Sequence, residues 1–288
     1  MGNIAVVTDT THYLPRELVE TNVIAQVSLY VNQGGRQQRE ADMDLDAFYA
    51  QLVEDRGPTT TSQPSVGDFL AVYDPLLSEG RDIVSVHIAG AISGTVEAAR
   101  QAAAEATAGG TRGRIAVIDS DTGAGGLGMV VLAAAAAART GADLEAVVAR
   151  TEAAKGDAPV WFAVDTLEYL RRGGRIGAAQ AWLGAALKIK PILTFDGEVT
   201  PFERVRTSGR AFERLVELLR ARHDDGADGW VVQHIRAPDQ AARMVDRGRE
   251  IFGRDPLFVS EIGPVVGAHL GPGLLGVGGV PRSLLGSD

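Results

Sequence analysis

The sequence predicts an α/β protein of two domains, with a parallel sheet in a three-layer N-terminal domain and a mixed sheet in the C-terminal domain. The chain has 288 residues, and a single hydrophobic core rarely grows beyond about 250–300 residues. Hydrophobic residues make up 45% and charged residues 23% of the chain, which is typical of globular proteins. Apolar runs of strand length also alternate with helical periodicities, the order expected of a parallel sheet.

In the first half of the chain, short apolar runs are separated by amphipathic or alanine-rich segments. The expected strands are Ile4–Val7, Ile24–Val31, Ile83–Ile88 and Ile115–Ile118. The expected helices follow Pro15, lie near Leu45–Val53, start at Ser65, and cover Thr95–Ala106, Leu127–Arg139 and Leu144–Ala154. This alternation favours crossover connections between parallel strands.

The best candidate for a domain boundary is Gly156-Asp157-Ala158-Pro159, because Gly, Asp and Pro together interrupt a helix. We therefore predict domains at 1–157 and 158–288. In the second domain Asp196-Gly197 predicts a hairpin, since Gly tolerates positive φ, and a hairpin implies antiparallel pairing. Its other expected elements are strands Val160–Val164, Trp230–His234 and Leu257–Ile262, and helices Leu167–Arg171, Ala179–Leu187, Arg210–Arg222 and Asp239–Phe252.

Composition argues against several classes of partner and chemistry. The formal net charge of −9 would repel nucleic acid and anionic membranes. There is no cysteine, so disulfides and thiol catalysis are absent. The N-terminus enters a strand pattern without a signal peptide, which favours a cytoplasmic location. The least charged stretch, 123–138, is too short to span a bilayer, so we expect no stable membrane insertion.

Ser93-Gly94-Thr95 is the most informative polar segment. It follows the expected strand Ile83–Ile88, and ligands of open parallel sheets bind at the carboxyl ends of the strands. Gly94 permits close backbone approach, and free N–H groups where Thr95 begins a helix attract anions. The spacing predicts an anion site, and it equally permits Ser93 to be a plain helix cap.

A second group of hydroxyls lies in 59–65, Thr-Thr-Thr-Ser-Gln-Pro-Ser. Ser65 and Asp68 have the spacing of a capping box in which Asp replaces Glu. Capping does not account for Thr61 and Ser62. These two side chains are candidate donors to a ligand, and the alternative is an ordinary polar loop.

Several basic side chains could either contact a ligand or partner or simply be solvated. Gly173-Gly174 follows Arg171-Arg172 and allows Arg175 to point where a regular helix would not. Arg175 and Arg206 could contact a phosphate or a protein partner, or be solvated; for Arg171 and Arg172 we favour solvation. His269 lies in a Gly-rich apolar loop, 267–273, where it needs a partner or a ligand.

No catalytic centre is indicated. Asp9 and Asp119 follow expected strands, and we interpret them as caps because no His, Asp or Glu cluster has convincing metal spacing. The chain has no Gly-x-Ser-x-Gly elbow and no Walker Gly-Lys-Ser/Thr loop. Kinase activity within this chain is therefore poorly supported.

Taken in order, these segments resemble the DegV family across nearly the whole chain. The matching motifs are Val7-Thr8-Asp9-Thr10, Thr61-Ser62-Gln63-Pro64-Ser65, Ser93-Gly94-Thr95, Asp119-Ser120, Asp165-Thr166-Leu167-Glu168-Tyr169-Leu170, Gly173-Gly174-Arg175-Ile176, Ile189-Lys190-Pro191-Ile192-Leu193 and Gly267–Gly273. Each motif is loose, but so many in one order are specific.

The resemblance implies a bacterial fatty-acid-binding protein that encloses a long acyl chain between its two domains. Such a carrier presents the carboxylate to a separate ATP-dependent fatty acid kinase for acyl-phosphate formation, and it is not itself the enzyme. No metal and no cofactor beyond the bound fatty acid is implied. By this likeness the carboxylate-binding residues are Thr61, Ser93, Gly94, Thr95 and His269, and the residues nearer the acyl phosphate or the kinase are Arg175 and Arg206.

The sequence departs from the family pattern at Thr10, where Ser is commoner, and at Ala89-Gly90, where Ser often follows the strand. These departures predict the loss of one or two polar contacts.

Two alternative functions are also considered. One is an enzyme or phosphotransfer component for a small carbonyl or phosphorylated substrate, as in dihydroxyacetone kinase substrate domains. The other is a purely structural or regulatory module.

Overall fold

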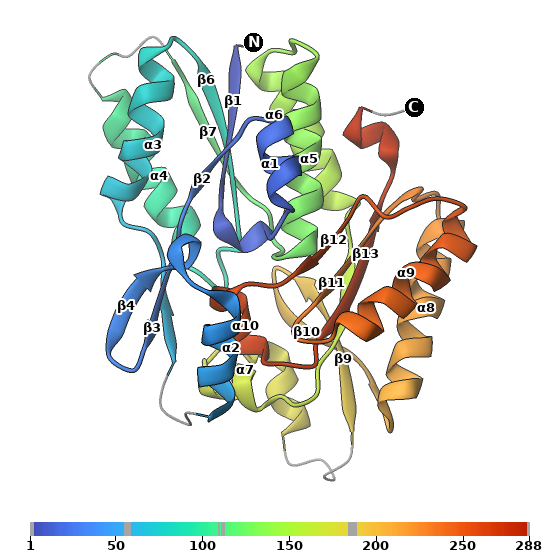
Figure 1. The fold of residues 1–288 in the computed structure, drawn as a ribbon. Helices are drawn as coiled ribbons and strands as arrows, with labels where there is room; N and C mark the ends of the chain where they lie inside the picture. Colours follow the sequence, from blue (N-terminus) through green and yellow to red (C-terminus); the bar gives the residue numbers. More distant parts are fainter. Residues whose placement is uncertain (1–2, 55–58, 109, 111–112, 184–188, 287–288) are drawn as a thin grey trace.

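The computed structural model describes residues 3–54, 59–108, 110, 113–183 and 189–286 (Figure 1). Two sheets, each with its own helices, form the two domains, and a small antiparallel sheet lies beside them. The boundary between residues 157 and 158 stays a prediction. The helix before it ends at Gly156 and the next strand starts at Val160.

The N-terminal domain is built on a four-stranded parallel sheet of order β2-β1-β6-β7. Its strands are β1 (Ile4–Asp9), β2 (Ile24–Val27), β6 (Asp82–His87) and β7 (Ile115–Asp119). Its helices are α1 (Arg16–Thr21), α3 (Val66–Ser78), α4 (Thr95–Thr107), α5 (Gly125–Arg139) and α6 (Leu144–Gly156). In Figure 1, α3 and α4 cover one face, and α1, α5 and α6 cover the other.

Alternation along the strands explains the three layers. Ala5 and Val7 of β1 pack into the cluster under α3 and α4, whereas Ile4 and Val6 join the cluster that contains α5. Successive side chains of a strand point to opposite faces, so a strand buried on both faces reads as a continuous apolar run. The predicted three-layer parallel arrangement is confirmed.

Helix α5 joins the two domains. Its residues Gly125–Ala138 are all buried, and it contacts β1 and β6 of the parallel sheet as well as β11 and β13 of the second sheet. Small Ala and Gly side chains allow close approach on all sides. The largest hydrophobic cluster consequently runs through both domains.

The C-terminal domain contains a six-stranded mixed sheet of order β10-β9-β8-β13-β11-β12, in which only β11 and β12 are parallel neighbours. The strands are β8 (Val160–Ala163), β9 (Lys190–Asp196), β10 (Glu198–Val205), β11 (Gly229–His234), β12 (Phe258–Glu261) and β13 (Leu275–Val280), covered by α8 (Ser208–Asp224) and α9 (Pro238–Phe252). The predicted hairpin is confirmed, with Gly197 at φ 70°.

Five segments differ from the expectations. The expected strand 24–31 is two strands, because the chain leaves the parallel sheet after β2; β3 (Tyr30–Gln33) instead pairs with β4 (Arg36–Arg39) and β5 (Thr60–Ser62). Residues 60–62 are thus a strand, not a loop. The expected helix 179–187 is a 3-10 helix over Gly177–Trp182, and 184–188 lie outside the described residues.

The other two differences are glycine-rich segments near the C-terminus. Residues 267–270, expected as part of the loop 267–273, belong to helix α10 (Pro264–Leu270). Strand β13 has no counterpart in the expectations because its Gly-rich sequence does not alternate; its pairing with β8 and β11 makes it a strand. The remaining elements are α2 (Leu45–Glu54), α7 (Glu168–Arg172), η1 (Thr10–His12), η2 (Glu40–Asp42) and η4 (Arg282–Leu285).

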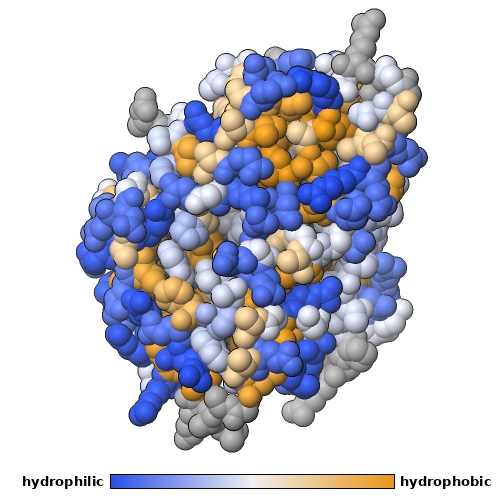
Figure 2. All heavy atoms as spheres, turned by 180° about the vertical axis from the view of Figure 1, so that it is seen from behind, coloured by the Kyte–Doolittle hydropathy of each residue, from blue (hydrophilic) through white to orange (hydrophobic). Residues whose placement is uncertain are grey.

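Hydrophilic side chains cover much of the rear face, with apolar areas between them (Figure 2). Among the described residues, no helix is both long and apolar enough to cross a bilayer.

Candidate functional site

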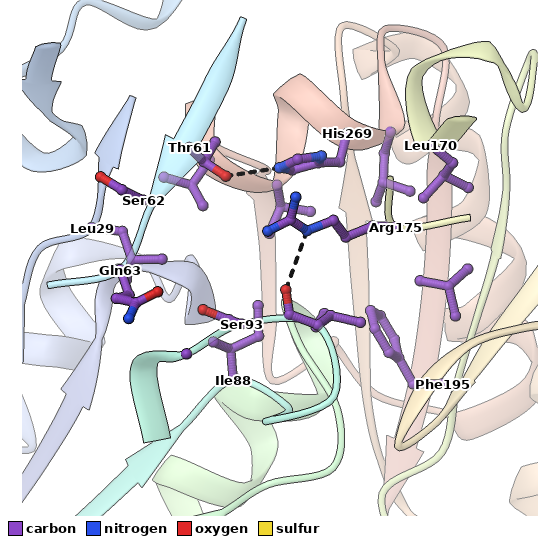
Figure 3. A pocket seen from close by; sticks show the side chains of 16 residues that line it. Leu29, Thr61, Ser62, Gln63, Ile88, Ser93, Leu170, Arg175, Phe195 and His269 are labelled. Carbon is purple, nitrogen blue, oxygen red and sulfur yellow. Dashed lines mark hydrogen bonds between the residues drawn. The ribbon is translucent and has the colours of Figure 1, made fainter. Parts of the chain in front are cut away.

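A cavity lies between the two domains, at the carboxyl edge of the parallel sheet (Figure 3). Its polar lining consists of Thr61, Ser62, Gln63, Ser93, Arg175 and His269, and its apolar lining includes Leu29, Ile88, Leu170, Phe195, Val265 and Leu270. None of the described residues that line it is acidic. Hydroxyls, an amide and a guanidinium without a nearby carboxylate favour an anionic group.

Thr61 and His269 meet in this cavity although 208 positions separate them. Thr61 comes from β5 and His269 from the last turn of α10, and Thr61 Oγ1 lies 2.8 Å from His269 Nε2. Burial, together with the positive charge of Arg175, lowers the pKa of His269 to about 4. The imidazole is therefore neutral at neutral pH.

The contacts of His269 indicate its tautomer. Within the described part of the chain, His269 Nδ1 is buried and has no hydrogen-bond partner. A buried N–H without a partner is rarer than an under-used acceptor, so we assign the proton to Nε2. His269 then donates to Thr61 Oγ1, and the hydroxyl proton of Thr61 is left to donate to a ligand.

Ser93 stands at the N-terminus of α4. The cap residue of this helix is Gly94, which corrects the alternative that Ser93 caps it. Ser93 Oγ accepts from the N–H of Thr95 at 3.3 Å and lies 2.8 Å from Thr95 Oγ1. Thr95 is fully buried and fixes the Ser93 hydroxyl instead of lining the cavity. A Cβ on Gly94 would lie 2.6 Å from the Gln63 amide, so a side chain at this position would require Gln63 to move.

The glycine pair before Arg175 has two separate roles. Gly174 adopts φ 67°, a conformation that favours glycine. A Cβ on Gly173 would lie only 2.0 Å from His269 Nδ1, so its missing side chain makes room for the imidazole. Arg175 donates to Gly173 O at 2.7 Å and to Ile92 O at 3.3 Å, which holds its guanidinium at the cavity.

Arg171, Arg172 and Arg206 do not line the cavity. Arg171 and Arg172 are exposed and pair with Glu168, each at 2.7 Å, which agrees with the solvated interpretation. Arg206 is exposed and does not line the cavity. Its contact with a phosphate or a partner stays a prediction.

A second, apolar cavity adjoins the cavity of Thr61 and His269. Phe195 and Leu270 line both. The second cavity is walled by apolar groups that include Phe162, Val231 and Leu274, with Gln233 as a polar exception. A polar opening that leads into an apolar interior suits an amphipathic ligand.

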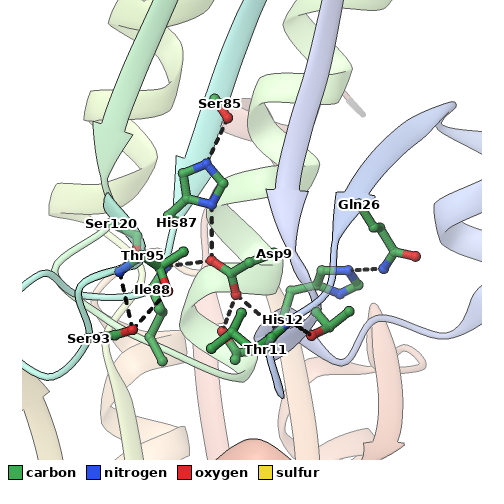
Figure 4. A network of polar contacts seen from close by, with 12 residues as sticks. Asp9, Thr11, His12, Gln26, Ser85, His87, Ile88, Ser93, Thr95 and Ser120 are labelled. Atoms are coloured by element: carbon green, nitrogen blue, oxygen red, sulfur yellow. Dashed lines mark hydrogen bonds and ion pairs between the residues drawn. The ribbon is translucent and has the colours of Figure 1, made fainter. Parts of the chain in front are cut away.

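A buried polar network supports the sheet next to the site (Figure 4). Asp9 caps η1 through the Thr11 N–H at 3.0 Å, as expected, and also accepts from the Ile88 N–H at 3.0 Å and contacts His87 Nδ1 at 3.1 Å. His87 Nε2 lies 2.7 Å from Ser85 Oγ. This Asp–His–Ser order resembles a hydrolase triad, but all three side chains are fully buried. A substrate cannot reach them, so the network is structural.

Asp119 is not a helix cap, contrary to our interpretation. It ends β7, and its carboxylate accepts from the N–H groups of Gly90 and Asp121 at 3.1 and 3.0 Å. It thereby fixes the loop at 89–90, where the family's serine is replaced. Among the described residues, no three or more His, Asp or Glu side chains lie together in a group that could hold a metal.

Sequence reasoning missed Glu40, which is only 7% exposed. Its carboxylate accepts from Thr10 Oγ1, from Tyr13 OH at 2.8 Å and from the N–H of Val265 at 2.8 Å. Burial raises the pKa of Glu40 to about 7, although these hydrogen bonds oppose the shift. Thr10 thus makes a polar contact despite departing from the family pattern. No local signal marks Glu40, because its partners are distant in sequence.

Comparison with known protein families and structures gives a consistent result. The family model described as an uncharacterised protein of the DegV family matches residues 3–282. A DegV domain-containing protein from Streptomyces coelicolor is 41% identical over 278 residues, covering 96% of this chain and 97% of that protein. Protein DegV of Bacillus subtilis is 35% identical over 282 residues, covering 96% and 98%.

Solved structures agree. A structure described as fatty acid binding of a DegV family protein from Thermus thermophilus has a TM-score of 0.86 at 36% identity, covering 96% of this chain and 99% of that one. DegV of Bacillus subtilis, described as a fatty acid binding protein, has a TM-score of 0.86 at 33% identity, covering 97% and 99%. With a matching family model and relatives above 30% identity over nearly its full length, the chain belongs to the DegV family.

Proposed function

We propose that this protein binds a long-chain fatty acid between its two domains, with the carboxylate at Thr61, Ser93 and His269 and the acyl chain in the apolar cavity. The observation that carries the proposal is the acid-free cavity with its cluster of polar side chains, which adjoins a second, apolar cavity at Phe195 and Leu270. The fatty acid binding described for the similar Thermus thermophilus and Bacillus subtilis proteins supports it.

The two parts of the site have different energetic roles. Burying about a dozen methylenes at ~0.8 kcal/mol each contributes roughly 10 kcal/mol before the costs of association. A carboxylate is expensive to bury without partners. Thr61, Ser93 and the N–H groups at the start of α4 supply donors, and Arg175 supplies positive charge.

The same groups suit a carrier that presents its ligand to a separate ATP-dependent fatty acid kinase. Hydroxyls hold a carboxylate without activating it for attack, and the neutral imidazole of His269 orients the Thr61 hydroxyl. Arg175 is exposed and lines the cavity, and we assign it, with Arg206, to contact with the kinase or the acyl phosphate. The proposal places the protein in the cytoplasm and keeps the domain boundary at residues 157/158.

A covalent role for His269, as in dihydroxyacetone kinase substrate domains, fits the geometry less well. Nδ1 faces the backbone of Gly173, and Nε2 is engaged by Thr61. Either nitrogen would have to leave its present contact before it could attack a carbonyl.

The direct test is organic extraction of the purified protein followed by mass spectrometry. We expect about one long-chain fatty acid per chain, or uptake of added palmitate to that level. Absence of both would rule out the carrier function, and turnover of a small carbonyl substrate without a kinase would favour the alternative.

Gly173→Ala is expected to weaken palmitate binding by about tenfold or more, because the new methyl group displaces the His269 ring that contacts Thr61. Calorimetric titration measures the affinity. Gly209→Ala is the matched control, since nothing lies within 4 Å of a Cβ there. Equal affinities in the two variants would contradict the role assigned to Gly173.

A further inference from the structure

Helix α10 is capped by side chains from the opposite end of the chain. Its cap residue, Gly263, contributes no side chain. The N–H of Val265 donates to Glu40 Oε1 at 2.8 Å, and the N–H of Val266 donates to Tyr13 OH at 3.0 Å. These partners are 225 and 253 positions away. Two of the N–H groups that a helix leaves unpaired are therefore satisfied across the domains.

The capping side chains Tyr13 and Glu40 pack closely against each other and against Gly263. Tyr13 OH donates to Glu40 Oε1 at 2.8 Å, so the two side chains form one unit. A Cβ on Gly263 would lie 2.6 Å from Tyr13 Cε1 and 3.0 Å from Glu40 Oε1. Tyr49 OH adds a hydrogen bond to Ile262 O at 2.7 Å. The chain that leads into α10 is thus held against the N-terminal domain.

The orientation of α10 decides the geometry of the ligand cavity. The helix has seven residues, too few to be stable without tertiary contacts. Four of them, Val265, Val266, His269 and Leu270, line the cavity. Any rotation or withdrawal of α10 would move His269 Nε2 away from Thr61 Oγ1.

We propose that Glu40 and Tyr13 are positioning residues of the ligand site: by capping α10 from the N-terminal domain they hold His269 against Thr61. Neither side chain lines the cavity, so both act through the helix. The proposal rests on the fatty-acid function above for its ligand. Its geometric part, the position of His269, can be tested without a ligand.

The test compares Glu40→Ala and Tyr13→Phe with the wild type in two measurements. The first is the pKa of His269, followed by NMR of the imidazole and assigned with His269→Gln. We expect the pKa to rise by about one unit in both variants, because a loosened ring becomes hydrated. The second is palmitate affinity by calorimetry, which we expect to fall about tenfold.

Asp42→Asn is the matched control, since Asp42 is an exposed carboxylate on the same short helix as Glu40. It should leave both measurements unchanged. Should Glu40→Ala not fold, Tyr13→Phe decides alone.

An unchanged His269 pKa in the folded variants would overturn the proposal, as would an equal shift in Asp42→Asn. A wild-type protein that binds no palmitate would instead refute the proposed function. The His269 titration would still decide whether Glu40 and Tyr13 position the ring.

Discussion

Replacing Asp9 with alanine is expected to lower the free energy of unfolding by about 3–5 kcal/mol, because it leaves several buried hydrogen-bond donors without their acceptor. The carboxylate is fully buried and is shared by His87, the N–H of Ile88 and the capped turn at Thr11. These donors would stay buried without an acceptor. Urea denaturation at pH 7 measures the loss.

Asp74→Ala is the control for this measurement. Asp74 is exposed on α3, so its removal should change the free energy of unfolding by no more than about 0.5 kcal/mol. Comparable losses in the two variants would contradict the structural role of the Asp9 network.

The same network predicts a pH dependence of stability. Burial alone would raise the pKa of Asp9, but the hydrogen bond and charge of His87, with the hydrogen bonds from Thr11 and Ile88, lower it below 3.8. An acid with a lowered folded pKa stabilises the fold above its unfolded pKa, and this contribution is lost as pH falls through the folded value. We expect acid unfolding below pH ~4 to be less steep in Asp9→Asn, measured by circular dichroism.

The second large effect concerns the ligand. Combining Thr61→Val with Ser93→Ala should weaken palmitate binding by about a hundredfold, since each removes a hydrogen bond worth roughly 1.5–3 kcal/mol when the acceptor is charged. Both side chains line the cavity and neither belongs to a buried core cluster. Calorimetric titration should therefore show the loss while the melting temperature changes little.

Thr60→Val is the matched control for the double variant. Thr60 is the neighbouring residue on β5, is exposed and does not line the cavity. Its affinity for palmitate should equal that of the wild type. A double variant that binds as tightly as Thr60→Val would place the carboxylate elsewhere.

Much of the fold was predictable because its signals are local. The parallel strands were recognised as apolar runs, and Gly197 at φ 70° forms the turn that Asp196-Gly197 predicted. The capping box is confirmed, with Ser65 Oγ accepting from Asp68 N at 3.1 Å and Asp68 Oδ2 accepting from Ser65 N at 2.8 Å. These features depend on residues only a few positions apart.

The candidate site was predictable residue by residue, but its assembly was not. Thr61, Ser93, Arg175 and His269 line one cavity, whereas Arg206 does not line it. Only the resemblance to the DegV family predicted that these residues lie together in one site. The prediction of a loop around His269 is wrong. Its glycines indicate irregular structure, and no local signal predicts α10, because the groups that cap this helix lie at the other end of the chain.

The sequence by itself determined the alternating helices and strands of the parallel sheet, the anion-ready turn at Ser93-Gly94-Thr95 and the family resemblance. Only the tertiary structure decided that Thr61 meets His269, that β13 lies between β8 and β11, and that Glu40 caps α10. The physical reason is the range of the interactions. Periodicity and turn chemistry act between neighbours in sequence, whereas hydrogen bonds between segments more than 200 positions apart form only when both domains have packed.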